Sequence, residues 1–258
     1  MTKAMTVTGK DEKSAAEEKR ISDIVNFQNS FSEGMLCGVD EVGRGPLAGP
    51  VLTCAVIFPR DVHILSVNDS KKLSEKKRTG LYRTLIDSAV AVGIGIAGPD
   101  VIDEVNIRQA TFIAMRQSIK MLYDSNEKCM LYEMDGFVCY EYHGITVKIL
   151  NDDMLELVRK IGRNNCRPDF VLADGFDIPE LDIPQASMAK GDSKCFSIAG
   201  ASIIAKVTRD AIMDRYDEIY PGYGFASGKG YGTREHIEAL KNKGILPIHR
   251  ASFIKNFV

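Results

Sequence analysis

The chain has 258 residues, of which 45% are hydrophobic and 26% charged, and its formal net charge is −2. These values are typical of a globular protein with one large or two small domains, and they exclude a disordered or fibrous chain. No apolar run approaches the roughly 20 residues of a membrane span, and no apolar stretch follows the charged N-terminus. We therefore expect a cytoplasmic protein without a secretory signal or a membrane span.

The charge is unevenly distributed along the chain. Residues 71–83 hold six basic and one acidic side chain, residues 169–192 hold one basic and six acidic, and residues 193–258 hold ten basic and six acidic. An acidic stretch between basic ones could bind cations at one point and an anionic polymer around it, although a single run is more often a solvated face. The six cysteines are scattered without a Cys-x-x-Cys pair, which favours free thiols over a zinc site or a disulfide framework.

The N-terminal half alternates between strand and helix patterns. Residues 1–34 are rich in charge, and Ile21, Ile24, Val25 and Phe27 predict an amphipathic helix late in this tail. The elements expected next are strands at 35–39 and 51–58 joined as a hairpin, a helix at 74–88, a strand at 90–97 and a helix at 100–123.

The C-terminal half begins with three β-rich runs at 130–134, 137–142 and 145–150. Asp135-Gly136 and His143-Gly144 separate them, and such dipeptides favour tight turns, so we expect a three-stranded meander followed by a helix at 151–161. The remaining expected elements are a strand at 170–173, a long helix at 196–216, a glycine-rich loop at 221–233 and a helix at 234–243. This order predicts an α/β fold with a mixed central sheet flanked by helices.

The densest chemical signal is the run at 38–50, which reads Gly-Val-Asp-Glu-Val-Gly-Arg-Gly-Pro-Leu-Ala-Gly-Pro. Asp40 and Glu41 follow an apolar strand, where adjacent buried carboxylates raise each other's pKa or require a cation. Successive strand residues point to opposite faces, so both could reach one metal only if the strand ends or bends there. Arg44 adds a positively charged guanidinium group, whose planar arrangement of donors suits phosphate. A glycine-rich hairpin with a surface salt bridge is an equally good interpretation of this run alone, whereas Pro46 and Pro50 exclude a dinucleotide-binding loop.

Two further aspartates could complete a metal site. Asp174 ends an apolar strand before a glycine, and Asp192 precedes a long helix. Carboxylates brought to one edge of a sheet suit Mg²⁺, which leaves positions open for a phosphate. Each aspartate alone is more often a turn or N-cap residue. Asp135 has the same local form, but its setting between strands favours a structural role.

Aromatic residues and glycines alternate at 220–233. Such a loop could stack on a base or sugar while nearby cations hold the backbone. We expect Tyr223 and Phe225 to plug the edge of the core, and Tyr231 to be the better candidate for contact with a ligand.

Together these segments resemble the ribonuclease HII family, the type 2 ribonucleases H. The matching blocks occur in the family's order and cover most of residues 35–255; they lie at 38–50, 68–74, 174–175, 190–194, 198–210, 220–233 and 247–253. The resemblance implies a ribonuclease H-like fold and an endonuclease that cuts the RNA strand of RNA/DNA hybrids, including single ribonucleotides in duplex DNA.

The resemblance also assigns roles by position. The family's four acidic residues fall on Asp40, Glu41, Asp174 and Asp192, which would hold two Mg²⁺ or Mn²⁺ ions. One ion would activate water and the other would stabilise the leaving 3′ oxygen, leaving a 3′-hydroxyl and a 5′-phosphate. The resemblance assigns the remaining residues to the substrate: Gly43, Arg44 and Gly45 to the ribose 2′-hydroxyl, Tyr231 to the sugar at the RNA–DNA junction, and Lys71, Lys194 and Lys206 to phosphates.

The chain departs from the family pattern in two places. Several tens of extra residues lie somewhere within 122–167, and Gly228 stands where relatives commonly have a histidine. We expect a tail or helix at 1–34 and a monomeric catalytic domain at 35–258 that contains this insertion. Only 34 residues precede the expected catalytic domain, and the Gly-Arg-Gly element is present; the sister family ribonuclease HIII normally lacks this element and has a larger N-terminal domain, so the resemblance favours ribonuclease HII. A catalytically silent nucleic-acid binding module and another metal phosphoesterase on this fold are the alternatives.

Overall fold

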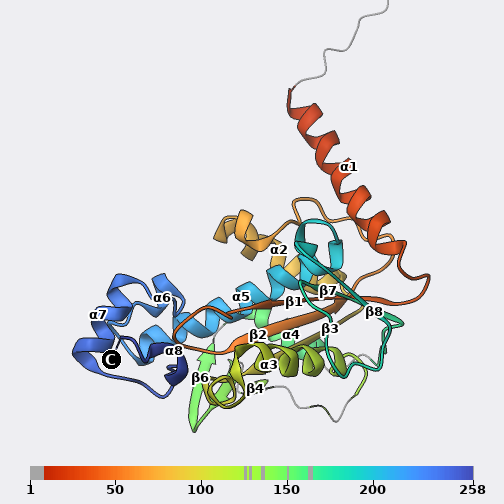
Figure 1. The fold of residues 1–258 in the computed structure, drawn as a ribbon. Coiled ribbons are helices and arrows are strands. Elements are labelled where there is room, and N and C mark those ends of the chain that lie inside the picture. Colours follow the sequence, from red (N-terminus) through yellow and green to blue (C-terminus); the bar gives the residue numbers. More distant parts are fainter. Residues whose placement is uncertain are drawn as a thin grey trace, which may run out of the picture.

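A five-stranded mixed sheet forms the centre of the protein (Figure 1). The structure is a computed structural model that describes residues 9–124, 127, 130–134, 137–149, 151–161 and 165–257. The strands lie in the order β3-β2-β1-β7-β8, with β1 antiparallel to β2, β2 antiparallel to β3, and β1, β7 and β8 mutually parallel. Their bounds are β1 Leu36–Val42, β2 Val51–Ile57, β3 Ala91–Ala97, β7 Phe170–Asp174 and β8 Gln185–Met188.

One long helix covers each face of this sheet. Helix α5 (Phe196–Ile219) packs on β1 and β2, and α3 (Pro99–Lys120) packs on β3 and β2 from the other side. The alternation of a strand explains how β2 serves both, because Leu52 and Cys54 cluster with residues of α5 while Ala55 clusters with residues of α3. Helix α3 lies so close that a Cβ at Gly95 would be 1.9 Å from the carbonyl oxygen of Ala114. The predicted α/β architecture with a mixed, helix-flanked sheet is confirmed.

The N-terminal part of helix α1 (Gly9–Asn29) stands away from the body (Figure 1), and contact with the body begins at Glu17, which accepts a hydrogen bond from the N–H of Ser66. The last turns of α1 return to the core, where Ile21, Ile24 and Val25 are buried. The helix expected late in the tail is therefore confirmed, although it begins earlier. Phe27 was expected on the apolar face but is 42% exposed, with its ring edge-on to Phe31.

A second, three-stranded sheet lies beside the C-terminal half of α5. It consists of β4 (Leu131–Met134), β5 (Phe137–Tyr142) and β6 (Ile145–Ile149), all antiparallel, and α4 (Asp152–Lys160) follows. The predicted meander and helix are confirmed. Both His143 and Gly144 have positive φ, as a tight hairpin turn requires. The other predicted turn, at Asp135-Gly136, lies outside the described residues. The ring of Tyr140 meets Tyr216 of α5 edge-on.

Short elements account for the differences from prediction. The expected helices at 74–88 and 234–243 are confirmed as α2 (Glu75–Ser88) and α7 (Arg234–Lys243), but the expected loop at 221–233 contains α6 (Phe225–Gly228). Strand β8, α8 (Ala251–Ile254), η1 (Ser70–Lys72) and η2 (Gly191–Ser193) were not expected. Each has only three or four residues, too few for a periodic pattern to be recognised.

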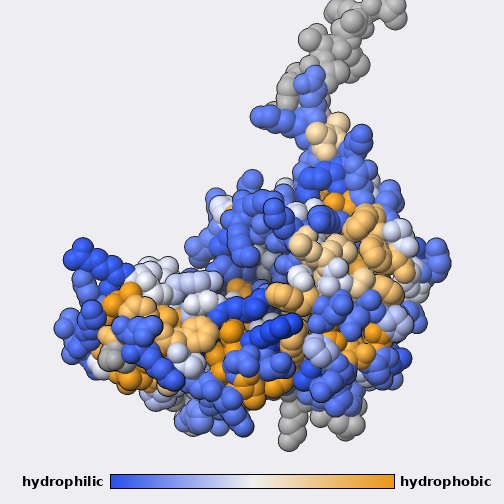
Figure 2. Space-filling view, viewed as in Figure 1, coloured by the Kyte–Doolittle hydropathy of each residue, from blue (hydrophilic) through white to orange (hydrophobic). Residues whose placement is uncertain are grey.

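Apolar side chains reach the surface in several places. On the face shown in Figure 2, hydrophobic residues reach the surface near the base of α1 and around α6, α7 and α8. Within the described part of the chain, the structure contains no helix that is both long enough and apolar enough to cross a membrane.

Candidate active site

Parallel pairing of β1 with β7 brings two of the predicted carboxylates together. The register pairs Val39 with Ala173, so Asp40 and Asp174 follow as the next residues on neighbouring strands. Strand β7 ends at Asp174, whereas β1 continues to Val42 because it still pairs with β2. Strand β1 therefore does not end at the carboxylates.

The two adjacent carboxylates of β1 point to opposite faces of the sheet. Leu36 and Leu172 cluster with residues at the start of α5, whereas Cys37 and Val39 cluster with residues of α3. By alternation along the strands, Asp40 and Asp174 face α5, whereas Glu41 starts out toward α3. Glu41 lies near the end of β1, however, where it lines a cavity with Ser202 and Lys206 of α5, and its charge raises the pKa of Asp40. Three of the four predicted acidic residues, Asp40, Asp174 and Asp192, thus lie on the α5 side.

A loop contact places Asp192 beside this pair. Asp192 lies in η2, directly before α5, and is only 7% exposed. The backbone N–H of Gly191 donates to Oδ1 of Asp174 at 2.7 Å. A Cβ at Gly191 would be 2.6 Å from Cδ1 of Ile198, so glycine is what allows this close approach.

The carboxylates raise each other's pKa. Burial raises the pKa of Asp40 well above its ordinary value, and the charges of Glu41 and Asp174 add to this effect. Burial raises the pKa of Asp192 to about 6, with further contributions from Asp69 and Asp174. Burial also raises the pKa of Glu41, an effect that the guanidinium of Arg44 opposes. We call Asp40, Glu41, Asp174 and Asp192 the acidic region. It concentrates negative charge that the protein alone does not neutralise.

These residues fit a divalent metal ion. Among the described residues, no three His, Cys, Asp or Glu side chains converge tightly enough to form a ready-made ligand set. However, Oε2 of Glu41 is buried without a hydrogen-bond partner, and the pKa values of Asp40, Glu41 and Asp192 are all raised. A divalent cation would remove both costs, because hard oxygen ligands are what Mg²⁺ and Mn²⁺ prefer.

Three residues at this site were missed as site residues by the sequence analysis. Asp69 lies close enough to Asp192 for its charge to raise the pKa of that carboxyl. The hydroxyl of Ser202 lies 2.8 Å from that of Ser70, and it lowers the pKa of Asp40. The block at 68–74 is the available signal for Asp69 and Ser70, but the role predicted from it concerns Lys71 alone. Ser202 lies inside α5, where a single serine gives no functional signal.

A cavity of about 270 Å³ brings Glu41 together with most of the predicted substrate residues. Its walls come from β1 and the following turn, η1, α5 and the loop before α7. They include Glu41, Gly43, Arg44, Gly45, Lys71, Lys206 and Tyr231. Lys194 does not line this cavity; it is exposed and donates to the carbonyl of Ala189 at 2.9 Å.

Arg44 and Tyr231 present polar and aromatic surface in this cavity. Nη1 of Arg44 lies 3.4 Å from Oε1 of Glu41, and its Nε is buried without a partner. Its guanidinium also lies 5.2 Å from the ring centre of Phe176. Tyr231 is 47% exposed, and a Cβ at Gly45 would be 3.4 Å from its ring. The two segments that carry these residues are therefore in contact.

The other aromatic residues of the 220–233 segment behave as expected. Tyr223 and Phe225 are buried and stack on one another, which confirms their role at the edge of the core. Gly228 ends α6, and its carbonyl accepts a hydrogen bond from the N–H of Tyr231 at 2.8 Å. This backbone contact does not depend on the side chain that relatives commonly have there.

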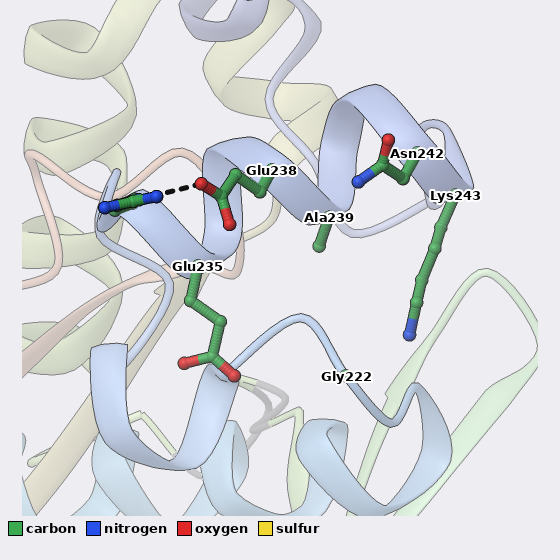
Figure 3. A pocket seen from close by; sticks show the side chains of 7 residues that line it. Gly222, Glu235, Glu238, Ala239, Asn242 and Lys243 are labelled. Carbon is green, nitrogen blue, oxygen red and sulfur yellow. Dashed lines mark hydrogen bonds and ion pairs between the residues drawn. The ribbon is translucent and has the colours of Figure 1, made fainter.

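A second hollow, of about 490 Å³, lies along α7 (Figure 3). It shares no residue with the acidic region. Arg234 pairs with Glu238 at 2.8 Å across one end, and Lys243 donates to the carbonyl of Pro221. Both cationic side chains are therefore already paired with neighbouring groups of the chain, so this hollow is not a candidate active site.

Residues 37–256 match the family model described as Ribonuclease HII. The ribonuclease HII of Lachnoclostridium phytofermentans is 46% identical over 246 residues, which cover 95% of this chain and 80% of the relative. That of Clostridioides difficile is 44% identical over 245 residues, which cover 94% of this chain and 80% of the relative.

Solved structures share the fold. The ribonuclease H2 from Pyrococcus horikoshii OT3 aligns with a TM-score of 0.57 at 22% identity, over 84% of this chain and 93% of that one. The complex of PCNA with ribonuclease HII from Archaeoglobus fulgidus contains a chain that aligns with a TM-score of 0.53 at 24% identity, over 84% and 94% of the two chains.

Proposed function

Because the chain belongs to the ribonuclease HII family, we propose that it incises duplex DNA on the 5′ side of a single embedded ribonucleotide. As a family member it is an endoribonuclease that acts on RNA/DNA hybrids and depends on divalent metal ions. The incision of isolated ribonucleotides is a narrower activity, since it requires the protein to recognise one 2′-hydroxyl among deoxyriboses.

The single observation that supports this proposal is the composition of the 270 Å³ cavity. It places Gly43, Arg44, Gly45 and Tyr231 beside Glu41, at the edge of the acidic region. Discrimination between RNA and DNA needs donors and a sugar-packing surface held in fixed positions. In this cavity, the guanidinium of Arg44 offers donors beside Glu41, and the half-exposed ring of Tyr231 is a surface for a sugar.

We propose that Asp40, Glu41, Asp174 and Asp192 hold two divalent ions, either Mg²⁺ or Mn²⁺. When bound, the ions supply a water nucleophile at neutral pH and offset charge on the leaving oxygen. The chain's own contribution is to orient the ligands. The N–H of Gly191 donates to Asp174, and the hydroxyl of Ser202 favours the ionised form of Asp40. Hydrolysis in this arrangement leaves a 3′-hydroxyl and a 5′-phosphate.

The phosphate contacts are assigned by position. Lys71 and Lys206 line the cavity, and Lys71 also lowers the pKa of Glu41 and Asp192. We propose that both bind substrate phosphates close to the cut. Lys194 lies outside the cavity, so we propose that any phosphate it contacts lies further along the duplex.

The remaining proposals concern organisation. We propose that residues 35–258 form the catalytic domain, that the insertion within 122–167 belongs to it, and that residues 1–34 are an N-terminal tail or helix. The central sheet, which carries Asp40, Glu41 and Asp174, supports this division. We further propose that the protein acts as a monomer in the cytoplasm, where the five described cysteines, all free thiols, would stay reduced.

The test uses labelled duplexes that contain one ribonucleotide, an all-RNA strand or no ribonucleotide. With Mg²⁺ or Mn²⁺, we expect incision 5′ of the lone ribonucleotide, cleavage of the hybrid and no cleavage of DNA. An intact single-ribonucleotide duplex alongside a cut hybrid would refute the proposal. Arg44→Ala should reduce cleavage of the single-ribonucleotide duplex more than cleavage of the hybrid. Arg234→Ala, an exposed arginine beside the second hollow, is the matched control and should leave both unchanged.

A further inference from the structure

Two loops face the proposed ribose site, and one C-terminal segment holds both. The 43–50 loop carries Arg44, and the 229–233 loop carries Tyr231. The N–H of Leu47 donates to the carbonyl of Gly230 at 2.7 Å, which joins the loops directly. The segment at 246–250 runs behind them, with Ala48 bridged to His249 and the N–H of Arg250 donating to Leu47.

Arg250 binds the first loop through its carbonyl oxygens. The side chain is completely buried. Its Nη1 donates to Arg44 at 3.0 Å, and its Nη2 donates to Gly43 at 2.5 Å and to Gly49 at 2.8 Å. A planar guanidinium can reach three carbonyls at once because its donors form a rigid fork, which a lysine does not have. Arg250 thus fixes the backbone on which Arg44 is carried.

His249 holds the second loop through a chain of hydrogen bonds. The N–H of Leu246 donates to Nδ1 of His249 at 2.8 Å, so this nitrogen carries no proton. The opposite Nε2 of His249 lies 3.0 Å from Nε2 of His236. Nδ1 of His236 lies 2.9 Å from the carbonyl oxygen of Tyr231, which can only accept. His236 therefore donates from Nδ1, and His249 donates from Nε2 to His236.

Both imidazoles are buried, and their tautomers follow from this chain. Burial lowers the pKa of His249 to about 4, with a further effect from His236, and burial also lowers the pKa of His236. Both rings are neutral at physiological pH. A protonated His249 could not accept from Leu246, so the neutral pair is the form that holds Tyr231.

We propose that His249 and Arg250 form a clamp, the 249–250 clamp, that fixes Tyr231 relative to Gly43, Arg44 and Gly45. This inference rests on the proposed function, because the distance between these loops matters only if both contact one ribose. Neither clamp residue lines the cavity, so both act as positioning residues. The clamp determines selectivity for a lone ribonucleotide, since a hybrid offers 2′-hydroxyls at every position and tolerates a shifted loop.

The test compares two substitutions of His236, which links the clamp to Tyr231. His236→Phe keeps a flat ring but removes both hydrogen bonds. His236→Asn keeps a donor near the position of Nδ1. For each variant, kcat/KM is measured on the single-ribonucleotide duplex and on the hybrid, and the ratio of the two values is compared.

We expect His236→Phe to lower this ratio about tenfold, because small displacements of a binding group have effects of this order or larger. His236→Asn should recover most of the ratio. Arg250→Lys should also lower this ratio, since a lysine cannot make all the guanidinium's hydrogen bonds to the carbonyls of the first loop. A ratio unchanged by His236→Phe, or an Asn variant no better than the Phe variant, would overturn the clamp.

A measurement on the unmodified protein keeps the inference testable if these variants do not fold. ¹⁵N NMR of the imidazoles should show His249 protonated only at Nε2 and His236 only at Nδ1. The opposite tautomer of either ring would contradict the chain of hydrogen bonds. This outcome is independent of cleavage, so it separates failure of the clamp from failure of the proposed ribonucleotide incision.

Discussion

The acidic region lies next to the clamped loops, which are the 43–50 and 229–233 loops held by the 249–250 clamp. The two regions differ in whether their buried polar groups have partners within the chain. In the acidic region, Asp40 and Asp192 are buried among like charges, and an oxygen of Glu41 lacks a partner. Behind the loops, two buried arginines donate to backbone carbonyls. Arg250 binds the first loop, and Arg209 of α5 donates to Pro50 at 2.9 Å and to Lys229 at 3.0 Å.

This difference shows which region needs something from outside the chain. Unpaired buried charges destabilise a folded protein unless a partner neutralises them, so the acidic region is incomplete without a cation. Among the described residues, the buried nitrogens of Arg209, Arg250, His236 and His249 all have partners. The loops are therefore held in position before a substrate binds, which is how a site recognises one hydroxyl.

The largest effect should come from Asp174→Asn. The amide oxygen can still accept from Gly191, so the loop that carries Asp192 should stay in place. The charge needed for metal binding is lost, and we expect cleavage to fall at least about a hundredfold to a thousandfold, as for other preorganised electrostatic groups. Binding of a hybrid, measured by fluorescence anisotropy, should be retained.

Stability measurements make this prediction sharper. Because Asp174 raises the pKa of Asp40 through repulsion, its neutralisation should leave the metal-free protein at least as stable as before. A strong loss of stability, or full turnover by the variant, would show that the acidic region is not organised around a metal ion.

In the clamped loops, we expect an effect of intermediate size, on the free energy of unfolding and not on the cleavage step. Gly43 has a φ of +88°, and a Cβ there would lie 2.2 Å from Nε of Arg209 and 2.7 Å from the carbonyl of Pro50. We expect Gly43→Ala to lower the free energy of unfolding by about 2 kcal/mol or more. Urea denaturation of the metal-free protein measures this change.

Gly45→Ala is the matched control, since a Cβ at Gly45 would make only ordinary contact at 3.4 Å with the ring of Tyr231. It should change the free energy of unfolding by less than about 0.5 kcal/mol. Equal effects of the two alanines would indicate that the loop is not held as tightly as its hydrogen bonds suggest.

The sequence predicted the periodic elements and the carboxylates that end strands. Apolar runs located β1, β2, β3 and β7, and the long amphipathic patterns located α2, α3 and α5. Asp174 was recognisable because it ends an apolar strand before a glycine. The face on which Glu41 lies was not predictable, because it depends on where β1 stops pairing with β2.

Residues that act through tertiary contacts gave no local signal. Asp69 meets Asp192 only because η1 and η2 converge in the fold. Arg250 looked like any basic residue near the end of the chain, since its role depends on carbonyls that lie about two hundred residues earlier. For Lys194, a local motif was visible, but the direction of its side chain, toward Ala189, follows from the turn of η2.

The smallest expected effect is a pair of opposed pH dependences in the metal-free protein. The pKa of Asp192 is raised to about 6 from an ordinary value of 3.8, so its contribution to stability is present below pH 3.8 and is lost as pH rises through 6. The pKa of His249 is lowered to about 4 from 6.5, so its contribution is present above pH 6.5 and is lost as pH falls toward 4. These two slopes partly cancel between pH 5 and 7.

Removing either titrating side chain should therefore reveal the pH dependence of stability that the other one causes. Between pH 5 and 7 with EDTA, Asp192→Asn should make stability rise more steeply with pH, because the carboxylate's opposing slope is gone. His249→Asn, whose side-chain oxygen can still accept from Leu246, should make stability fall with pH. Urea unfolding at several pH values gives both slopes, and changes of the same sign would contradict the contrast between the two regions. Excess Mg²⁺ should abolish only the Asp192 effect, because a bound cation keeps that carboxylate ionised throughout this range.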